Sequence, residues 1–364
     1  MIPLVNLARS YDSLKNEIDA AMQAVCATGA YINGPFVEAF EQAFAGYCEI
    51  PHAAGTASGT SALHLALVAS GVGPGDEVIT TPATFVATVA AITHAGATPV
   101  LADVRADAPL LDAEAVERAV TPRTRAILPV HLYGHACDMD ALGGVAQRHG
   151  LVVVEDCSQA HGARWRGRRV GSLGHAGAFS LYPAKNFGGV GDGGVVTTAD
   201  EALARRIRRL RNWSQTSDLM HDEPAFNARL DAISAAVMSV KLPLLDAWCE
   251  ARRANAERYR EALSGTDLIL PHSPDGSESV WHVFAVRHPR QDALRQALAQ
   301  AGVQTGVHYA APIHGHPAYA HLAPAGGLPQ AERHFTDTFS LPVCPHLSAD
   351  EQEHVIDTLL TALN

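Results

Sequence analysis

Between about residues 50 and 200, short β-rich runs alternate with helix-like segments. The apolar runs that predict strands cover residues 76–81, 98–104, 125–134, 151–159, 176–182 and 193–198. The segments that predict helices between them cover residues 60–70, 87–96 and 138–150, with Asp138 as a plausible N-cap. This alternation predicts an α/β fold in which helices cover both faces of a mostly parallel sheet.

The pattern changes after the helix-like run that ends near residue 212. A long helical stretch over 233–263 contains Pro243, which is expected to kink or break it. One strand-like run (280–287) and two helices (291–302 and 349–363) follow. A chain of 364 residues usually holds two domains. We expect a large domain with N-terminal helices over 1–245 and a smaller C-terminal α/β domain over 246–364.

Charge and cysteine content narrow the classes of partner. The net charge of −11 speaks against a nucleic-acid or anionic membrane surface. The first 17 residues lack the pattern of a secretory signal, and no uncharged apolar run approaches the roughly 20 residues of a membrane helix. The six cysteines are scattered without a C-x-x-C pair, which favours reduced thiols in a cytoplasmic protein.

Lysine is rare in this chain, and one lysine has unusual neighbours. Only Lys15, Lys185 and Lys241 are lysines among 27 basic residues. Lys185 lies in the aromatic and glycine-rich run FSLYPAKNFGGVGDGG. An arginine keeps its proton near neutral pH, whereas a desolvated lysine can act as an amine nucleophile. Lys185 is therefore the candidate nucleophile, although a plain loop lysine is the alternative.

Two other segments suggest a binding site. The turn ASGTS (57–61) leads directly into an apolar helix, and a helix N-terminus with free N–H groups can hold a phosphate. Taken alone, the turn favours an ordinary helix cap over a phosphate site. Glu155 and Asp156 end a buried strand, where ligands of open α/β sheets bind. Asp156 is the candidate for function, with a loop-capping acid as the alternative.

Two further patterns are weaker. Gly189, Gly191 and Gly194 spell the dinucleotide fingerprint G-x-G-x-x-G, but they run into a strand instead of a helix. We expect these glycines to let the backbone pass close to a ligand. The histidine-rich stretches HLYGHAC (131–137) and HYAAPIHGH (308–316) lack the spacing of a closed zinc site, so no metal is expected.

A phosphate cradle, an acid at a strand end and a rare lysine, in this order, are what pyridoxal 5'-phosphate requires. The lysine amine forms a Schiff base with the cofactor aldehyde, and the carboxylate keeps the pyridine nitrogen protonated. The helix N-terminus holds the phosphate.

The chain resembles the sugar aminotransferases of the DegT/DnrJ/EryC1/StrS family, which are fold-type I enzymes that use pyridoxal phosphate. The resemblance covers essentially the whole chain in order and spacing. Its motifs are YINGPFVEAFEQAFAGY, ASGTSALHLAL, GDEVITTPATFVAT, PVHLYG, EDCSQAHGA, FSLYPAKNFGG, FNARLDAISAAVMSVKL, GVHYAAPIHGHPAY and FSLPVCPHLSADEQEHV.

The resemblance implies roles for individual residues. Lys185 is implied as the Schiff-base lysine and proton carrier, Asp156 as the partner of the pyridine nitrogen, and Gln159 as a neighbour of the ring hydroxyl. Phe85 is implied to stack on the ring. The residues implied to bind the phosphate are Gly59, Thr60, Ser61, Ser180 and, from a neighbouring subunit, Asn227. The residues implied to lie near the sugar nucleotide are Tyr182, Arg229, His308 and Tyr309.

The resemblance also implies the reaction. L-glutamate would convert the cofactor to pyridoxamine 5'-phosphate, which then aminates a nucleotide-linked keto-sugar in a homodimer with shared active sites. Related dehydratases carry histidine in place of Lys185. The run 226–259 is most similar to enzymes that aminate C3 of a dTDP-3-keto-6-deoxyhexose. Amination at C4 of a dTDP- or UDP-4-keto-sugar is the rival, and a binding or regulatory homologue without turnover is a second alternative.

The chain departs from the family pattern at two places near the expected sugar nucleotide. Many relatives read RNHG where this chain has RNWS, with Trp213 and Ser214. They often have a proline after the His-Tyr pair, where this chain has Ala310. Both departures bear on the substrate and leave the cofactor assignment intact.

Overall fold

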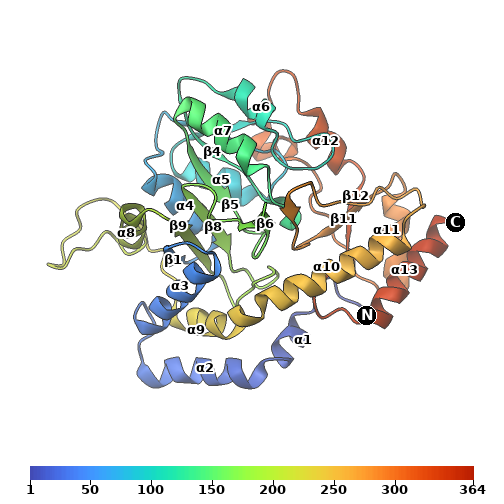
Figure 1. The fold of residues 1–364 in the computed structure, drawn as a ribbon, viewed down its shortest axis with the longest axis horizontal. Helices are drawn as coiled ribbons and strands as arrows, with labels where there is room; N and C mark the ends of the chain where they lie inside the picture. The colour runs from blue at the N-terminus through green and yellow to red at the C-terminus, as the bar shows by residue number, and fades with distance from the viewer.

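The computed structural model describes residues 1–364 and is built around a seven-stranded sheet (Figure 1). In spatial order the strands are β1 (His52–Thr56), β9 (Gly194–Thr198), β8 (Ala176–Ser180), β5 (Val152–Asp156), β4 (Thr124–Leu128), β2 (Glu77–Thr80) and β3 (Thr98–Leu101). The pairs from β8 through β3 are parallel, and only β9 runs antiparallel to both of its neighbours. The predicted mostly parallel sheet is confirmed.

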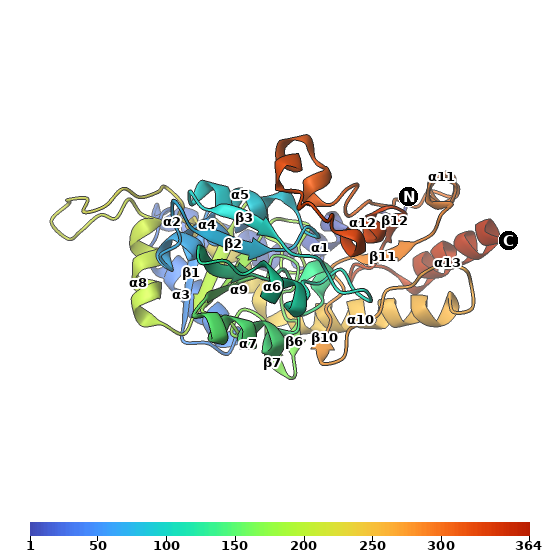
Figure 2. The ribbon, with the colours of Figure 1, turned by 90° about the horizontal axis from the view of Figure 1, so that it is seen from above.

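Helices cover both faces of this sheet. Figure 2 shows α4 and α5 on one side and α6 and α7 on the other. The helices that precede β5 in the chain are α1 (Leu7–Asp12), α2 (Lys15–Thr28), α3 (Pro35–Tyr47), α4 (Gly59–Ala69), α5 (Val86–His94), α6 (Ala113–Ala119), η1 (Leu132–Gly134) and α7 (Met139–His149). Asp138 caps α7 as predicted, because its carboxylate accepts the Ala141 N–H.

The remaining elements follow the reversed strand β9. The helices are α8 (Glu201–Leu210), α9 (Ala232–Lys241), η2 (Leu242–Leu244), α10 (Leu245–Ala262), α11 (Gln291–Gln300), η3 (Ile313–Gly315), η4 (Pro317–Leu322), α12 (Pro329–Phe335) and α13 (Ala349–Leu363). The short strands are β6 (Arg164–Trp165), β7 (Arg168–Arg169) and β10 (Ser277–Glu278) in one sheet, with β11 (Phe284–Arg287) and β12 (Thr338–Leu341) in another.

Pro243 breaks the long helical stretch as predicted. It lies in the 3-10 turn η2, between α9 and α10. Measured as one run of 31 residues, Ala232–Ala262 includes a window that could cross a membrane by length and composition alone. More than half of that window (56%) is buried inside the protein, and α9 packs against α2 and α3. The run is therefore a core element of this fold.

The buried apolar side chains form two clusters. The larger one, of 78 residues, surrounds the seven-stranded sheet and extends to Phe335. The smaller one, of 16 residues, lies between α10, β11, α11, β12 and α13. Because the larger cluster also takes side chains from residues 280–335, the division of the chain at residue 245 stays a prediction.

The sheet direction positions the site. Strands β1, β5 and β8 point the same way, so their carboxyl ends lie at one edge of the sheet. Ser58, Asp156 and Ser180 come from these three ends. Residues that are more than 100 positions apart in the chain therefore meet at one edge.

Candidate active site

A cavity of about 530 Å³ opens at this edge of the sheet. Ten residues singled out from the sequence line it, namely Gly59, Thr60, Phe85, Asp156, Gln159, Ser180, Tyr182, Lys185, His308 and Tyr309. Three others do not line it, namely Ser61, Asn227 and Arg229.

Lys185 lies in the loop that follows β8, where its backbone N–H donates to the Tyr182 carbonyl at 2.9 Å. Its ammonium group has no carboxylate within 4.0 Å. Burial lowers the pKa of Lys185 from 10.5 to about 8, and the negative charge of Asp156 opposes part of that shift. With this pKa, roughly a tenth of the molecules carry the neutral, nucleophilic amine at pH 7, far more than for an exposed lysine.

Asp156 ends β5 and is 4% exposed. One carboxylate oxygen accepts the Thr88 hydroxyl at 2.8 Å, and the other accepts the Ser158 N–H at 3.1 Å. Thr88 is in turn 2.6 Å from the hydroxyl of Thr84. Sequence reasoning missed both threonines. Thr88 lies in the apolar helix α5 and Thr84 lies just before it, and nothing in that sequence indicates that the helix packs beside Asp156. The two threonines fix the orientation of the carboxylate toward the cavity.

The N-terminus of α4 abuts the end of β8. A Cβ built on Gly59 would lie 2.5 Å from the Ser180 Cβ, so only glycine permits this approach. The first N–H groups of a helix have no partner within the helix, and Gly59 and Thr60 of this first turn line the cavity. Ser58 caps the helix by accepting the Ser61 N–H at 3.0 Å. Ser58 lines the cavity and Ser61 does not, so the cap residue is the one that sequence reasoning missed.

Two aromatic rings and an amide form another wall. The rings of Phe85 and Tyr309 have centroids 5.8 Å apart. Gln159 donates from Nε2 to the Tyr309 hydroxyl oxygen at 2.8 Å, and its Oε1 accepts the Tyr133 N–H at 2.8 Å. The Phe85 side chain is 53% exposed, so its ring is free to cover a bound group. A ring that is this exposed does not pack in the core.

Histidines complete the cavity opposite the sheet. His308 shares a hydrogen bond of 2.9 Å with the Ser340 hydroxyl, and its carbonyl accepts the Tyr133 hydroxyl. Burial and the nearby Lys185 charge lower the pKa of His308. His282, which the sequence did not single out, has its pKa lowered well below 6.5 by the same two causes. Both imidazoles are therefore neutral at neutral pH.

The loop between α8 and α9 carries two of the three predicted residues that do not line the cavity. Asn227 is exposed, and Arg229 donates from Nη1 to the Asn212 side chain at 3.0 Å. Trp213 is 47% exposed and does not line the cavity of its own chain. Figure 2 shows this loop projecting far beyond the sheet, beside α8. Within one chain, the structure does not bring Asn227 or Arg229 to the site.

The fingerprint-like glycines serve the chain itself. A Cβ on Gly194 would lie 2.3 Å from the Ser58 carbonyl oxygen, whereas Gly191 has open space around its Cα. The close approach at Gly194 is therefore to protein backbone, which corrects the expectation of a ligand there. No helix follows these glycines, since Gly194 begins β9. The dinucleotide interpretation fails for that reason.

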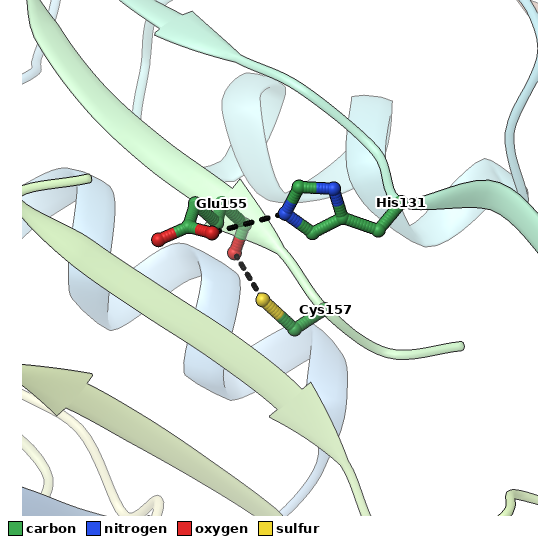
Figure 3. Close-up of side chains that lie close together, drawn as sticks. All are labelled: His131, Glu155 and Cys157. Atoms are coloured by element: carbon green, nitrogen blue, oxygen red, sulfur yellow. Dashed lines mark hydrogen bonds and ion pairs between the residues drawn. The ribbon is translucent and has the colours of Figure 1, made fainter. Parts of the chain in front are cut away.

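Glu155 and Asp156 have opposite roles because successive strand residues point to opposite faces. Glu155 is fully buried and accepts the N–H groups of Gly171, Leu173 and Gly174 at 2.7–2.8 Å. Figure 3 shows the ring of His131 bonded to Glu155, at 3.0 Å. Glu155 thus anchors the loop between β7 and β8 from behind the site.

His131, Glu155 and Cys157 have ligand atoms within 4.8 Å of one another, which is the arrangement that could hold a metal ion. The other ring nitrogen of His131 accepts the Cys137 N–H at 3.0 Å, so that nitrogen carries no proton. The remaining proton lies on Nε2 and points to Glu155. Both ring nitrogens are thereby occupied, and these side chains satisfy one another as a buried hydrogen-bond network. His131 and Cys137 are in contact here, whereas His135 lies against Trp281.

Replacing Glu155 with glutamine should lower the free energy of unfolding by about 2–4 kcal/mol, because an amide NH₂ would face backbone donors in a buried site. Urea unfolding of the purified protein measures this. Glu261→Gln, at an exposed position on α10, is the control and should change stability by less than about 0.5 kcal/mol. If Glu155→Gln lost no more free energy of unfolding than the control, Glu155 would not be the anchor of the loop between β7 and β8.

The cavity fits pyridoxal 5'-phosphate. An amine without an acidic partner, a carboxylate held by two donors and a helix N-terminus line the same space. Lys185 would hold the aldehyde carbon, Asp156 the ring nitrogen, and the α4 N-terminus with Ser58 and Ser180 the phosphate. The bound cofactor supplies an electron sink for proton removal at the substrate carbon.

Comparison with known proteins agrees with this site. The model of the DegT/DnrJ/EryC1/StrS aminotransferase family matches residues 12–360. The chain is 48% identical to a dTDP-3-amino-3,4,6-trideoxy-alpha-D-glucose transaminase of Streptomyces venezuelae, covering 98% of this chain and 95% of that one. It is also 48% identical to the erythromycin biosynthesis sensory transduction protein EryC1 of Saccharopolyspora erythraea, over 98% of both chains.

Solved structures give the same result. The crystal structure of S. venezuelae DesV in complex with a ketimine intermediate superposes with a TM-score of 0.97 at 47% identity, covering 100% of this chain and 99% of that one. A Brucella abortus member of the family also gives 0.97, at 34% identity over the full length of both chains. The fold is that of the pyridoxal-phosphate-dependent sugar aminotransferases, and the chain belongs to the DegT/DnrJ/EryC1/StrS aminotransferase family.

Proposed function

We propose that the protein transfers an amino group from L-glutamate to C3 of a dTDP-3-keto-6-deoxyhexose. The observation that carries the proposal is the convergence of unpaired Lys185, oriented Asp156 and the α4 N-terminus on one cavity. The substrate follows from relatives named for dTDP-3-amino-sugar transamination, at 48% identity in S. venezuelae and 44% in Micromonospora megalomicea.

Each residue of the cavity has a separate role in this proposal. Lys185 captures the cofactor and then moves the proton to and from the substrate carbon. Asp156 keeps the ring nitrogen protonated, and the Phe85 ring covers the ring face. Gln159 lies where it can reach the ring hydroxyl, since it is held between Tyr133 and Tyr309.

The substrate end lies toward the opening. Tyr182, which is 54% exposed, and the pair His308 and Tyr309 line the part of the cavity that is left for the sugar. The neutral His308 can donate or accept a hydrogen bond at a sugar hydroxyl without adding charge.

The active site is shared in this proposal. Asn227 reaches the cofactor phosphate of a neighbouring subunit, and Arg229 reaches the substrate there. Support comes from their position at the base of the loop between α8 and α9, where Arg229 pairs with Thr56 and Asn227 with Asn212 while neither lines the cavity of its own chain. We place this homodimer in the cytoplasm because all six cysteines are free, five of them buried.

A regulatory role is the second candidate. Two similar proteins have regulatory names, the EryC1 sensory transduction protein and a pleiotropic regulatory protein of Geobacillus stearothermophilus that is 41% identical. Amination at C4 remains the rival within the catalytic proposal, because the cofactor residues are the same for both reactions.

A half-reaction assay tests the proposal. Purified protein loaded with pyridoxal phosphate is mixed with L-glutamate, and 2-oxoglutarate and pyridoxamine phosphate are measured as products. The pyridoxamine form is then offered a dTDP-3-keto- and a dTDP-4-keto-6-deoxyhexose separately. Amination of the 3-keto sugar is expected, with a kcat/KM at least about tenfold higher than for the 4-keto sugar. Cofactor uptake with no turnover of either sugar would favour the regulatory role.

A further inference from the structure

A second cavity, of about 380 Å³, meets the first one at Lys185. It lies between the N-terminal segment around Val5–Tyr11, the loop after Lys185, and the start of α10. Besides Lys185, it is lined by Lys241, Arg252 and His346. None of the chain's 38 Asp and Glu residues lines it, in a protein of net charge −11.

The two additional cations are buried without a carboxylate. Lys241 is 7% exposed, and its only hydrogen bond is from Nζ to the Gly188 carbonyl at 2.8 Å. Arg252 is 2% exposed and donates through Nη1 to the carbonyls of Trp281 and His282, at 3.1 and 3.5 Å. Its Nε is buried without any partner. Neither side chain forms an ion pair, although most arginines of this chain do.

An uncompensated buried charge is costly, and an arginine cannot lose its proton to avoid the cost. Backbone carbonyls carry only partial charge, so these three do not balance a guanidinium and an ammonium group. A cavity that is lined by such cations and by no acidic side chain is complementary in charge to a small anion. The central cavity differs, because Lys185 is its only Lys or Arg and it also contains Asp156 and Asp192.

We propose that this second cavity, lined by Lys241 and Arg252, binds an anionic group of a substrate. The inference rests on the proposed function, which requires substrates with carboxylate or diphosphate groups, and the central cavity of one chain offers no fixed cation besides Lys185 for them. The chemistry is that of a carboxylate or phosphate oxygen. The amino donor and the nucleotide-linked sugar are its two possible sources.

Binding experiments on the protein loaded with pyridoxal phosphate separate these sources. Calorimetric titrations use 2-oxoglutarate as the carboxylate probe and dTDP as the diphosphate probe. Lys241→Met removes the charge, and Lys241→Arg keeps it as the matched control. The affinity for one probe should fall roughly 30-fold in Lys241→Met and stay within about threefold in Lys241→Arg. The probe that loses affinity identifies the source, and no loss for either probe would overturn the inference.

A second measurement does not depend on folding of the Lys241 variants. Trp248 lines the cavity, while Trp165 and Trp281 are buried, each 5% exposed. In a Trp213→Phe background, iodide quenching of fluorescence therefore reports mainly on Trp248. Saturable protection by one of the two probes is expected, and quenching that neither probe changes would contradict an anion site.

The cofactor absorbance distinguishes the two possible failures. A protein without a pyridoxal phosphate band at Lys185 would refute the proposed function itself. A protein with that band, but with no difference between Lys241→Met and wild type in binding either probe, would refute the anion site alone.

Discussion

Lys185→Ala is expected to lower kcat by about 10⁴-fold, the upper end of what a positioned acid–base group contributes. The variant loses both the nucleophile that captures the cofactor and the base that moves the substrate proton. The absorbance spectrum with pyridoxal phosphate gives a readout apart from activity, because the band of lysine-bound cofactor should be absent. Lys15→Ala is the matched control, since Lys15 is exposed and pairs with Asp19.

Lys185→Arg sharpens this test. It keeps the positive charge at the site but cannot supply a neutral amine. We expect the activity of Lys185→Arg to be as low as that of Lys185→Ala. Activity within about tenfold of wild type in either variant would show that another group performs the chemistry.

The pH dependence of cofactor capture follows from the same residue. Burial lowers the pKa of Lys185 to about 8 in the cofactor-free protein, so the neutral, reactive amine is a minor form below pH 8 and the main form above it. The capture rate measured by stopped-flow absorbance should rise about tenfold per pH unit up to pH 7 and level off above pH 8. A rate that keeps rising to pH 10 would mean that Lys185 has the pKa of an exposed lysine.

Asp156→Asn is expected to lower kcat by roughly 10²–10⁴-fold while the protein still binds pyridoxal phosphate. The amide matches the carboxylate in shape but cannot keep the ring nitrogen protonated, so the cofactor loses most of its capacity to accept electrons. Stopped-flow measurement of the glutamate half-reaction isolates this step.

Asp192→Asn is the matched control for Asp156→Asn, because Asp192 is an exposed acid that lines the same cavity. Its kcat should stay within about threefold of wild type. Equal losses in the two variants would indicate that the general negative charge of the cavity matters, and that Asp156 has no specific partner on the cofactor.

The sequence by itself determined the sheet and the main chemical groups. Strands and helices follow from the periodicity of neighbouring residues, which is why the parallel sheet, the break at Pro243 and the cap at Asp138 were predictable. Lys185 stood out because lysine is rare here. The motifs that resemble the aminotransferase family predicted ten residues that line one cavity.

Only the tertiary structure shows which member of each local pair faces the cavity: the family resemblance implied Asp156, which lines it, and Ser61, which does not. Alternation along β5 places Glu155 and Asp156 on opposite faces, but it does not say which face is the site. The same holds for Ser58 and Ser61 on the first turn of α4. The partners that settle these choices, Thr88 for Asp156 and the 171–174 loop for Glu155, come from other elements.

The uncompensated cations show the same limit most clearly. Lys241 and Arg252 look like ordinary helix residues in the sequence, where nearby acids such as Asp246 and Glu250 could pair with them. In the folded chain both side chains are buried, and no Asp or Glu lines the cavity that they line. The periodicity of a sequence predicts local structure, because it depends on residues that are close together in the chain. The charge balance of a cavity depends on segments that are far apart in the chain and that meet only in the folded protein.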